Sequence, residues 1–110
     1  MSEYVFLYRN GEKMSPETMQ KQMVKWTAWF KDLGEKGVLK AVGQPLERSG
    51  KLVNGGGRTV TDGLFAEAKD IIGGYSIIEA KNIDHAVELS RGCPIFDAGG
   101  GVEIRPTMQM

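Results

Sequence analysis

The sequence predicts one α+β domain, residues 1–110, in which two helices cover one face of an antiparallel sheet. Three observations predict this class: short aromatic and β-branched runs typical of strands, two capped segments with helical periodicity, and an Asn-Gly-Gly-Gly turn between two short runs. The length of 110 residues, with 41% hydrophobic and 25% charged residues, is that of a single globular domain.

The first predicted strand, residues 4–9 ("YVFLYR"), ends at an Asn-Gly turn pair. A strand with one face in water normally alternates apolar and polar residues, but both faces of this strand are apolar. One face carries Tyr4, Phe6 and Tyr8, and the other carries Val5 and Leu7. We therefore expect both faces to be covered.

A first helix is predicted to begin after Ser15, whose hydroxyl can cap it, with Pro16 at the first helical position. Glu17 lies near the positive end of the helix dipole, and Gly34 and Gly37 end the helix. Its apolar stripe at helical spacing consists of Met19, Met23, Trp26, Phe30 and Leu33.

The middle of the chain predicts a second strand, a hairpin and a central strand. Residues 38–43 form the strand, and the hairpin pairs "KLV" with "RTVT" around a glycine-rich turn. Residues 71–80 are the longest strand candidate, and Gly73-Gly74 suggests a bulge or a close backbone approach there.

The last part of the chain predicts a helix and a strand. Asn82 can cap the helix, which Gly92 and Pro94 end, and residues 102–107 form the strand, with Val102 and Ile104 inward. The expected inner face of the helix consists of Ile83, Ala86, Val87 and Ser90. The order β-α-β, hairpin, β-α-β predicts a ferredoxin-like sandwich with a β-hairpin insertion.

This sandwich predicts a symmetric homodimer joined sheet to sheet. Two helices on one face would leave the aromatic residues of the opposite face exposed on a monomer, as a larger apolar patch than soluble chains usually leave open. A second subunit is the simplest cover.

Charge and cysteine content exclude several classes of partner. Fourteen basic residues balance fourteen acidic ones, which disfavours nucleic acid and anionic membranes. The sequence has a single cysteine, no zinc-site spacing, no apolar run of membrane-spanning length and no signal-peptide pattern near its start. These features predict a cytoplasmic protein. The glycine clusters "NGGGR" and "AGGGV" fit neither a phosphate loop nor a dinucleotide fingerprint, and we expect no cofactor.

The segment from Thr61 to Tyr75, "TDGLFAEAKDIIGGY", holds the main candidate site. Asp62 before a glycine is typical of a turn, and it is also a candidate catalytic carboxylate. Phe65 anchors the loop to the core or stacks on a ligand, and Glu67 can bind a polar ligand. The candidate pocket between sheet and helix is lined by Trp26, Phe65, Glu67, Tyr75 and Arg105.

Other reactive residues have structural interpretations as well. His85 is expected on the solvated side of its helix, without nucleophile partners, and Cys93 is expected to pack beside the helix end. Arg58 and Arg105 could hold a carboxylate if they face one cavity, although surface arginines that stay solvated are commoner.

The segment "VTDGLFAEAKDIIGGYSIIEAKNIDHAVELSRGCP", with "VEIRP" near the end, resembles the YCII-related family, specifically its DGPF-type members. The resemblance implies a ferredoxin-like fold that pairs into a dimeric α+β barrel. Some members have been proposed as enzymes through a His and Asp pair beside a pocket. DGPF-type members are associated with sigma factors by gene neighbourhood, which suggests a regulatory role.

Two departures limit what the resemblance implies about activity. Leu64 replaces the proline of the family motif, and the first helix contains no histidine for the proposed pair. Only Asp62, Phe65 and Glu67 therefore carry over. The sequence predicts a dimeric small-molecule-binding protein or cofactor-free enzyme, and the alternative is a non-enzymatic regulatory or interaction module.

Overall fold

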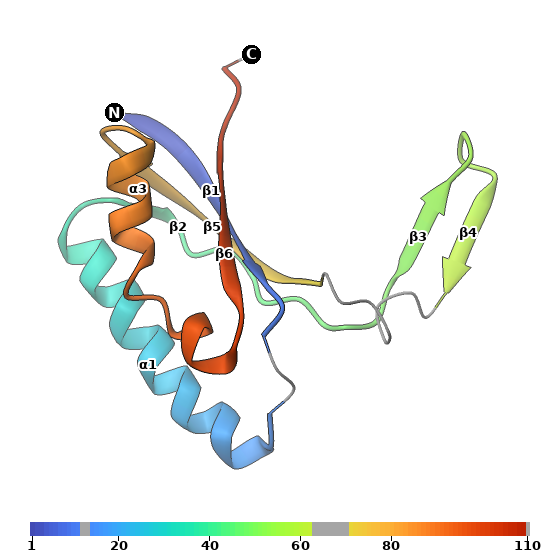
Figure 1. Ribbon diagram of the computed structural model, residues 1–110, viewed down its shortest axis with the longest axis horizontal. Coiled ribbons are helices and arrows are strands. Elements are labelled where there is room, and N and C mark those ends of the chain that lie inside the picture. Colours follow the sequence, from blue (N-terminus) through green and yellow to red (C-terminus); the bar gives the residue numbers. More distant parts are fainter. Residues whose placement is uncertain (12–13, 63–70, 110) are drawn as a thin grey trace.

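The computed structural model describes residues 1–11, 14–62 and 71–109, and its elements follow the predicted order (Figure 1). One antiparallel sheet has the strand order β2-β5-β1-β6, and the helices lie on one of its faces. A separate two-stranded hairpin, β3-β4, extends away from it. The elements are β1 (Ser2–Arg9), α1 (Pro16–Glu35), β2 (Leu39–Ala41), β3 (Lys51–Asn54), β4 (Thr59–Asp62), β5 (Ile72–Ala80), α3 (Ile83–Ser90), the 3-10 helix η1 (Pro94–Ala98) and β6 (Gly101–Pro106). The predicted α+β class is confirmed.

Strand β5 lies between β2 and β1, as its apolar sequence predicts. Its register with β1 shifts where Tyr8 faces Gly74 and Arg9 faces Ile72, so one glycine is extra on β5. This is the bulge that the Gly-Gly pair predicts. A Cβ atom on Gly74 would lie 3.1 Å from the carbonyl oxygen of Gln44, so the lack of a side chain allows the backbone of the next segment to approach.

Both predicted helix caps are present. The Ser15 side chain accepts a 3.3 Å hydrogen bond from the Thr18 amide at the start of α1, and the Asn82 side chain accepts a 2.8 Å bond from the His85 amide at the start of α3. Gly37, with φ of 72°, lies just beyond the end of α1 in the left-handed region. These signals fix where each helix begins and how the chain leaves α1.

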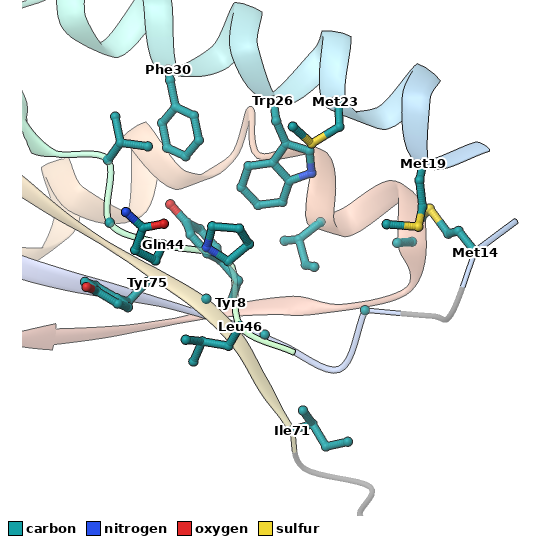
Figure 2. A pocket seen from close by; sticks show the side chains of 18 of the residues that line it. Tyr8, Met14, Met19, Met23, Trp26, Phe30, Gln44, Leu46, Ile71 and Tyr75 are labelled. Carbon is teal, nitrogen blue, oxygen red and sulfur yellow. The ribbon is translucent and has the colours of Figure 1, made fainter. Parts of the chain in front are cut away.

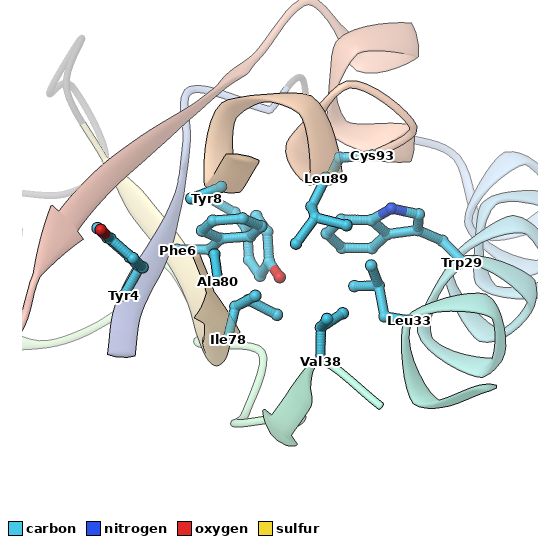
Figure 3. Packing of buried hydrophobic residues seen from close by; sticks show 11 residues of the cluster. Tyr4, Phe6, Tyr8, Trp29, Leu33, Val38, Ile78, Ala80, Leu89 and Cys93 are labelled. Carbon is cyan, nitrogen blue, oxygen red and sulfur yellow. The ribbon is translucent and has the colours of Figure 1, made fainter. Parts of the chain in front are cut away.

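The core lies between the helices and the aromatic face of β1 (Figure 3). Phe6 is fully buried and stacks against Trp29 of α1, with ring centroids 6.3 Å apart. The expectation that the aromatic row of β1 would remain exposed is therefore wrong, because the helices cover Tyr4, Phe6 and Tyr8. The uncovered face instead carries half-buried Val5 and Leu7.

The predicted apolar stripe of α1 is only partly a core stripe. Leu33 is buried, but Met19 and Met23 are 55% and 62% exposed, because the N-terminal part of the stripe borders a cavity. Trp29, which the stripe omits, fills the core instead. On α3, Ala86 and Ser90 are buried as predicted, whereas Ile83 is exposed and Leu89 takes an inward position.

The hairpin β3-β4 forms as the glycine-rich turn predicts, with Gly55, Gly56 and Gly57 all at positive φ. Every residue of β3 is exposed, and so are Thr59 and Val60 of β4, so these residues add nothing to the buried core. No helix in residues 1–11, 14–62 and 71–109 is both long and apolar enough to cross a membrane.

Candidate functional site

A cavity of about 630 Å³ opens between α1, the bulged start of β5 and the segment that follows β2 (Figure 2). This volume is within the range of cavities that bind small molecules. Its lining is Tyr8, Gly11, Met14, Met19, Met23, Trp26, Thr27, Phe30, Val42, Gly43, Gln44, Pro45, Leu46, Arg48, Ile71, Gly73, Gly74, Tyr75, Ile95 and Ala98. Apolar side chains dominate this lining.

One wall of the cavity is aromatic. Trp26 meets Tyr8 edge to face, with ring centroids 4.8 Å apart, and it packs at 5.7 Å against Phe30. Trp29 supports it from the core at 5.8 Å. Because packed rings on both sides hold the indole, Trp26 presents a preorganised surface on which a flat ligand can stack.

A second wall is made of methionines. Met14 and Met19 lie at the N-terminal end of α1, on the opposite side of the view from Phe30 and Tyr75, and Met23 lies beside Trp26 (Figure 2). Methionine side chains are flexible and polarisable, so they adapt to ligands of different outline. The site therefore combines a fixed aromatic surface with an adaptable one.

The third wall consists of residues 42–46, which are hydrogen-bonded to β5. Ser76 Oγ donates a 2.6 Å hydrogen bond to the Val42 carbonyl, and the Leu46 amide donates a 2.8 Å bond to the Gly73 carbonyl. Gly43 has φ of 74°, and a Cβ there would lie 1.8 Å from the Tyr75 carbonyl oxygen. Only glycine fits this position, so the wall depends on it.

The polar groups of the lining are mostly satisfied within the protein. Tyr8 donates a 2.7 Å hydrogen bond to Ser76 Oγ, and burial raises the pKa of Tyr8 further above neutral pH than that of an ordinary tyrosine. Thr27 donates to the Met23 carbonyl at 2.8 Å. Among the described residues that line the cavity, none is a carboxylate or a histidine. This arrangement suits the binding of an apolar molecule better than proton transfer.

Two of the five predicted ligand-binding residues, Trp26 and Tyr75, line this cavity. Arg105 does not. It lies on β6 opposite Val5, on the sheet face away from the helices, and donates a 3.2 Å hydrogen bond to Glu103. The expected pairing of Arg105 with Trp26 fails because strand alternation directs Arg105 to the sheet face away from the helices. Tyr75, opposite Leu7, belongs to the same face as Arg105 but lies next to Gly43, which also lines the cavity.

The remaining candidates are Asp62 and two residues that follow β4 in the sequence. Asp62 is the last residue of β4 and pairs with Lys51 in the hairpin register. Phe65 and Glu67 lie outside the described residues. The catalytic role of Asp62 and the ligand contacts of Phe65 and Glu67 therefore stay predictions.

The lone histidine and cysteine have local roles. His85 Nδ1 accepts a 3.0 Å hydrogen bond from the Lys81 amide, close to the start of α3. Cys93 is buried in the core, and this burial raises its thiol pKa to about 12. In the part of the chain that the structure describes, no three His, Cys, Asp or Glu side chains are grouped as metal ligands would be.

Sequence reasoning missed most of the cavity, including the wall of residues 42–46, Arg48 and the two η1 residues Ile95 and Ala98. A usable signal existed in the first helix. Two methionines precede the tryptophan in its stripe, and unbranched, adaptable side chains at the end of a stripe are as typical of a binding surface as of a core.

Comparison with known proteins identifies a solved structure with a similar fold and a matching family. No curated protein sequence matches the chain. Among solved structures, the chain is similar to 5-chloro-2-hydroxyhydroquinone dehydrochlorinase (TftG) from Burkholderia phenoliruptrix AC1100, in complex with 2,5-dihydroxybenzoquinone. The TM-score is 0.57 at 22% sequence identity, over 98% of this chain and 95% of that chain. The profile of the YCII-related domain matches residues 2–110, and the chain belongs to this family.

Proposed function

We propose that the protein binds a small, flat, largely apolar molecule in the cavity between α1 and β5. The observation that carries the proposal is the packing of Trp26 against Tyr8 and Phe30 at the edge of a 630 Å³ space. Aromatic rings stack on such a surface, and the methionine wall adjusts to substituents.

The likeness to TftG supports the size and shape of this ligand. That protein is described in complex with 2,5-dihydroxybenzoquinone, a single six-membered ring with oxygen substituents. A ring of this size is small enough for the cavity described here. We propose ring compounds of the phenol and quinone class as the first ligands to test.

Chemical-shift mapping tests the proposal directly. The ¹⁵N-labelled protein is titrated with 2,5-dihydroxybenzoquinone and with 2-naphthol. We expect saturable shifts of the Trp26 indole N–H and of the backbone amides of Gly43 and Gly74, which border the cavity. Shifts confined to residues of α3 or β6, or no saturable shift with either compound, would contradict the proposal.

Catalysis by the carboxylate of Asp62, at the end of β4, is a further part of the proposal. Asp62, with Phe65 and Glu67, would supply a carboxylate that the described lining of the cavity lacks. Replacement of Asp62 by Asn tests this. Loss of turnover of a bound ring compound, with unchanged binding and unchanged melting temperature, is the expected result. A lower melting temperature of the Asp62→Asn variant, without a specific loss of turnover, would instead favour a purely structural role of Asp62 in the turn.

We also propose a ferredoxin-like arrangement of the DGPF type that pairs into a dimeric α+β barrel in the cytoplasm. The strand order and the single helical layer support it. So does the uncovered sheet face, where half-buried Val5 and Leu7 lie opposite Arg105 and Glu103 of β6. A second subunit would remove these apolar side chains from water.

A second candidate function is an interaction module, without chemistry, linked to sigma-factor regulation. The hairpin β3-β4 favours it, because Leu52, Val53 and Val60 are exposed on a two-stranded element that extends from the body (Figure 1). Isolated hairpins are marginally stable in water. A variant in which a short Gly-Ser linker replaces residues 51–62 should still bind ring compounds but should no longer bind a sigma-factor partner. If the variant loses only the binding of ring compounds, the hairpin is not an interaction module.

A further inference from the structure

The cavity carries a single formal charge among its described lining residues, the guanidinium of Arg48. No carboxylate among the described residues forms an ion pair with it. The nearest in sequence, Glu47, accepts a 3.3 Å hydrogen bond from Ser49. Among the described residues, this positive charge has no carboxylate partner, and the rest of the described lining is uncharged.

Arg48 is held beside Gly11 in the lining of the cavity. Its Nη2 donates a 2.8 Å hydrogen bond to the carbonyl oxygen of Gly11, which also lines the cavity. Gly11 in turn lies close to Ile95, since a Cβ at Gly11 would be 2.8 Å from the Ile95 Cδ1. This contact uses one of the five N–H donors of the guanidinium and leaves the others for a ligand.

We propose that the ligand is an aromatic acid, with its ring against Trp26 and its anionic group on Arg48. The inference rests on the proposed function and narrows its ligand class. A carboxylate matches the planar fork of a guanidinium, and such charge-assisted bonds are stronger than bonds between neutral groups. The carbonyl of Gly11 fixes the orientation of the fork, so less side-chain freedom is lost when the ligand binds.

The remaining lining agrees with a ligand that has one anionic end. A cationic ligand would find no described carboxylate in the cavity, and a neutral one would leave the guanidinium without an anionic partner. Lys25, which could compete for an anion near η1, is paired with Asp97 at 3.2 Å. Arg48 is thus the one cationic side chain that both lines the cavity and, among the described residues, lacks a carboxylate partner.

Two probes of nearly equal shape test the inference. Affinities of 2-naphthoate and 2-naphthol, the second neutral at pH 7, are measured by calorimetry at low salt. We expect the wild-type protein to bind 2-naphthoate about tenfold more tightly. This preference should shrink as ionic strength rises, because Arg48 is exposed.

Three variants assign the preference to Arg48. Arg48→Gln should abolish the preference and leave 2-naphthol affinity within about twofold of the wild type. Arg48→Lys should keep part of it, because the charge remains but the planar fork is lost. Arg58→Gln, in the turn of the hairpin, removes an equal charge elsewhere and should change nothing.

The outcomes separate the inference from the function on which it rests. If both probes bind the wild type equally, or Arg48→Gln weakens both equally, the anionic ligand class is wrong and the cavity remains a ring-binding site. If neither probe binds, the proposed function fails as well.

Discussion

Tyr8 on β1 and Ser76 on β5 are joined by a buried hydrogen bond of 2.7 Å from the phenol to the serine oxygen. Ser76 Oγ then donates a 2.6 Å bond to the Val42 carbonyl. This pair of hydrogen bonds connects Tyr8, which packs against Trp26 in the aromatic wall of the cavity, to the wall that begins at Val42. The central strands and the cavity therefore share one polar connection.

The two hydrogen bonds predict unequal effects for the hydroxyl groups of Tyr8 and Ser76. Tyr8→Phe removes one donor and leaves the bond from Ser76 to Val42 intact, so the free energy of unfolding should fall by only about 0.5–1.5 kcal/mol. Ser76→Ala leaves both the phenol and the Val42 carbonyl without a partner and should lower it by about 2–4 kcal/mol. Urea denaturation measures both, and a larger effect of Tyr8→Phe would contradict this order.

The raised pKa values of Tyr8 and Cys93 predict that the free energy of unfolding falls at alkaline pH. Burial raises both pKa values in the folded protein, that of Cys93 from 9.0 to about 12. The unfolded chain then loses these protons first, so the free energy of unfolding falls as the pH rises above about 9, and the contribution of Cys93 is lost by about 12.

Cys93→Ala isolates the thiol in this effect. Between pH 9 and 10, the fall of the unfolding free energy with pH should become less steep by up to about 1.4 kcal/mol per pH unit. Urea denaturation at several pH values measures the slope rather than the absolute stability, so any packing defect of the variant cancels. An unchanged slope would show that the thiol is not the group responsible.

The close approach of Gly43 to Tyr75 predicts that a side chain at position 43 would disrupt the cavity wall. Gly43 and Gly37 have nearly the same φ, 74° and 72°, but a Cβ would clash with the Tyr75 carbonyl only at Gly43 and would meet nothing within 4 Å at Gly37. Gly37→Ala should therefore show the dihedral penalty alone, about 1–2 kcal/mol. Gly43→Ala should lose at least about 2 kcal/mol more and weaken ring binding. Equal effects in thermal unfolding would contradict the close approach.

The uncovered sheet face predicts a dimer, and a single charged residue introduced on this face should dissociate it. Leu7 lies on this face opposite Glu103, so a lysine there has an acidic neighbour and should leave the fold intact. Light scattering of the wild type should give twice the chain mass of 12.1 kDa, and Leu7→Lys should give the single mass. A wild type that scatters as one chain at micromolar concentration would exclude the dimer.

The sequence predicts the order of the elements because the signals are local. The hydroxyl of Ser15 and the amide of Asn82 determine the helix starts, and the glycines after Asn54 determine the hairpin. Each signal acts over a few residues. No distant part of the chain is needed to interpret them.

The positions of side chains relative to the core needed tertiary information. Periodicity places Met23, Trp26 and Phe30 on one stripe, but it does not tell whether the stripe meets a core or a cavity. Trp29 enters the core because α1 crosses the aromatic row of β1, where Phe6 stacks on it. The cavity itself depends on the contact of Gly43 with β5, between residues more than thirty positions apart.

The central claim, that the cavity binds a ring compound, is tested most directly by two adjacent substitutions on α1. Met23 and Val24 are both exposed, at 62% and 71%, but only Met23 lines the cavity. Met23→Glu and Val24→Glu add the same charge to the same helix. In a calorimetric titration with neutral 2-naphthol, we predict at least about tenfold weaker binding for Met23→Glu and a change within about twofold for Val24→Glu. Equal affinities for the two variants, or no binding by the wild type, would contradict the claim.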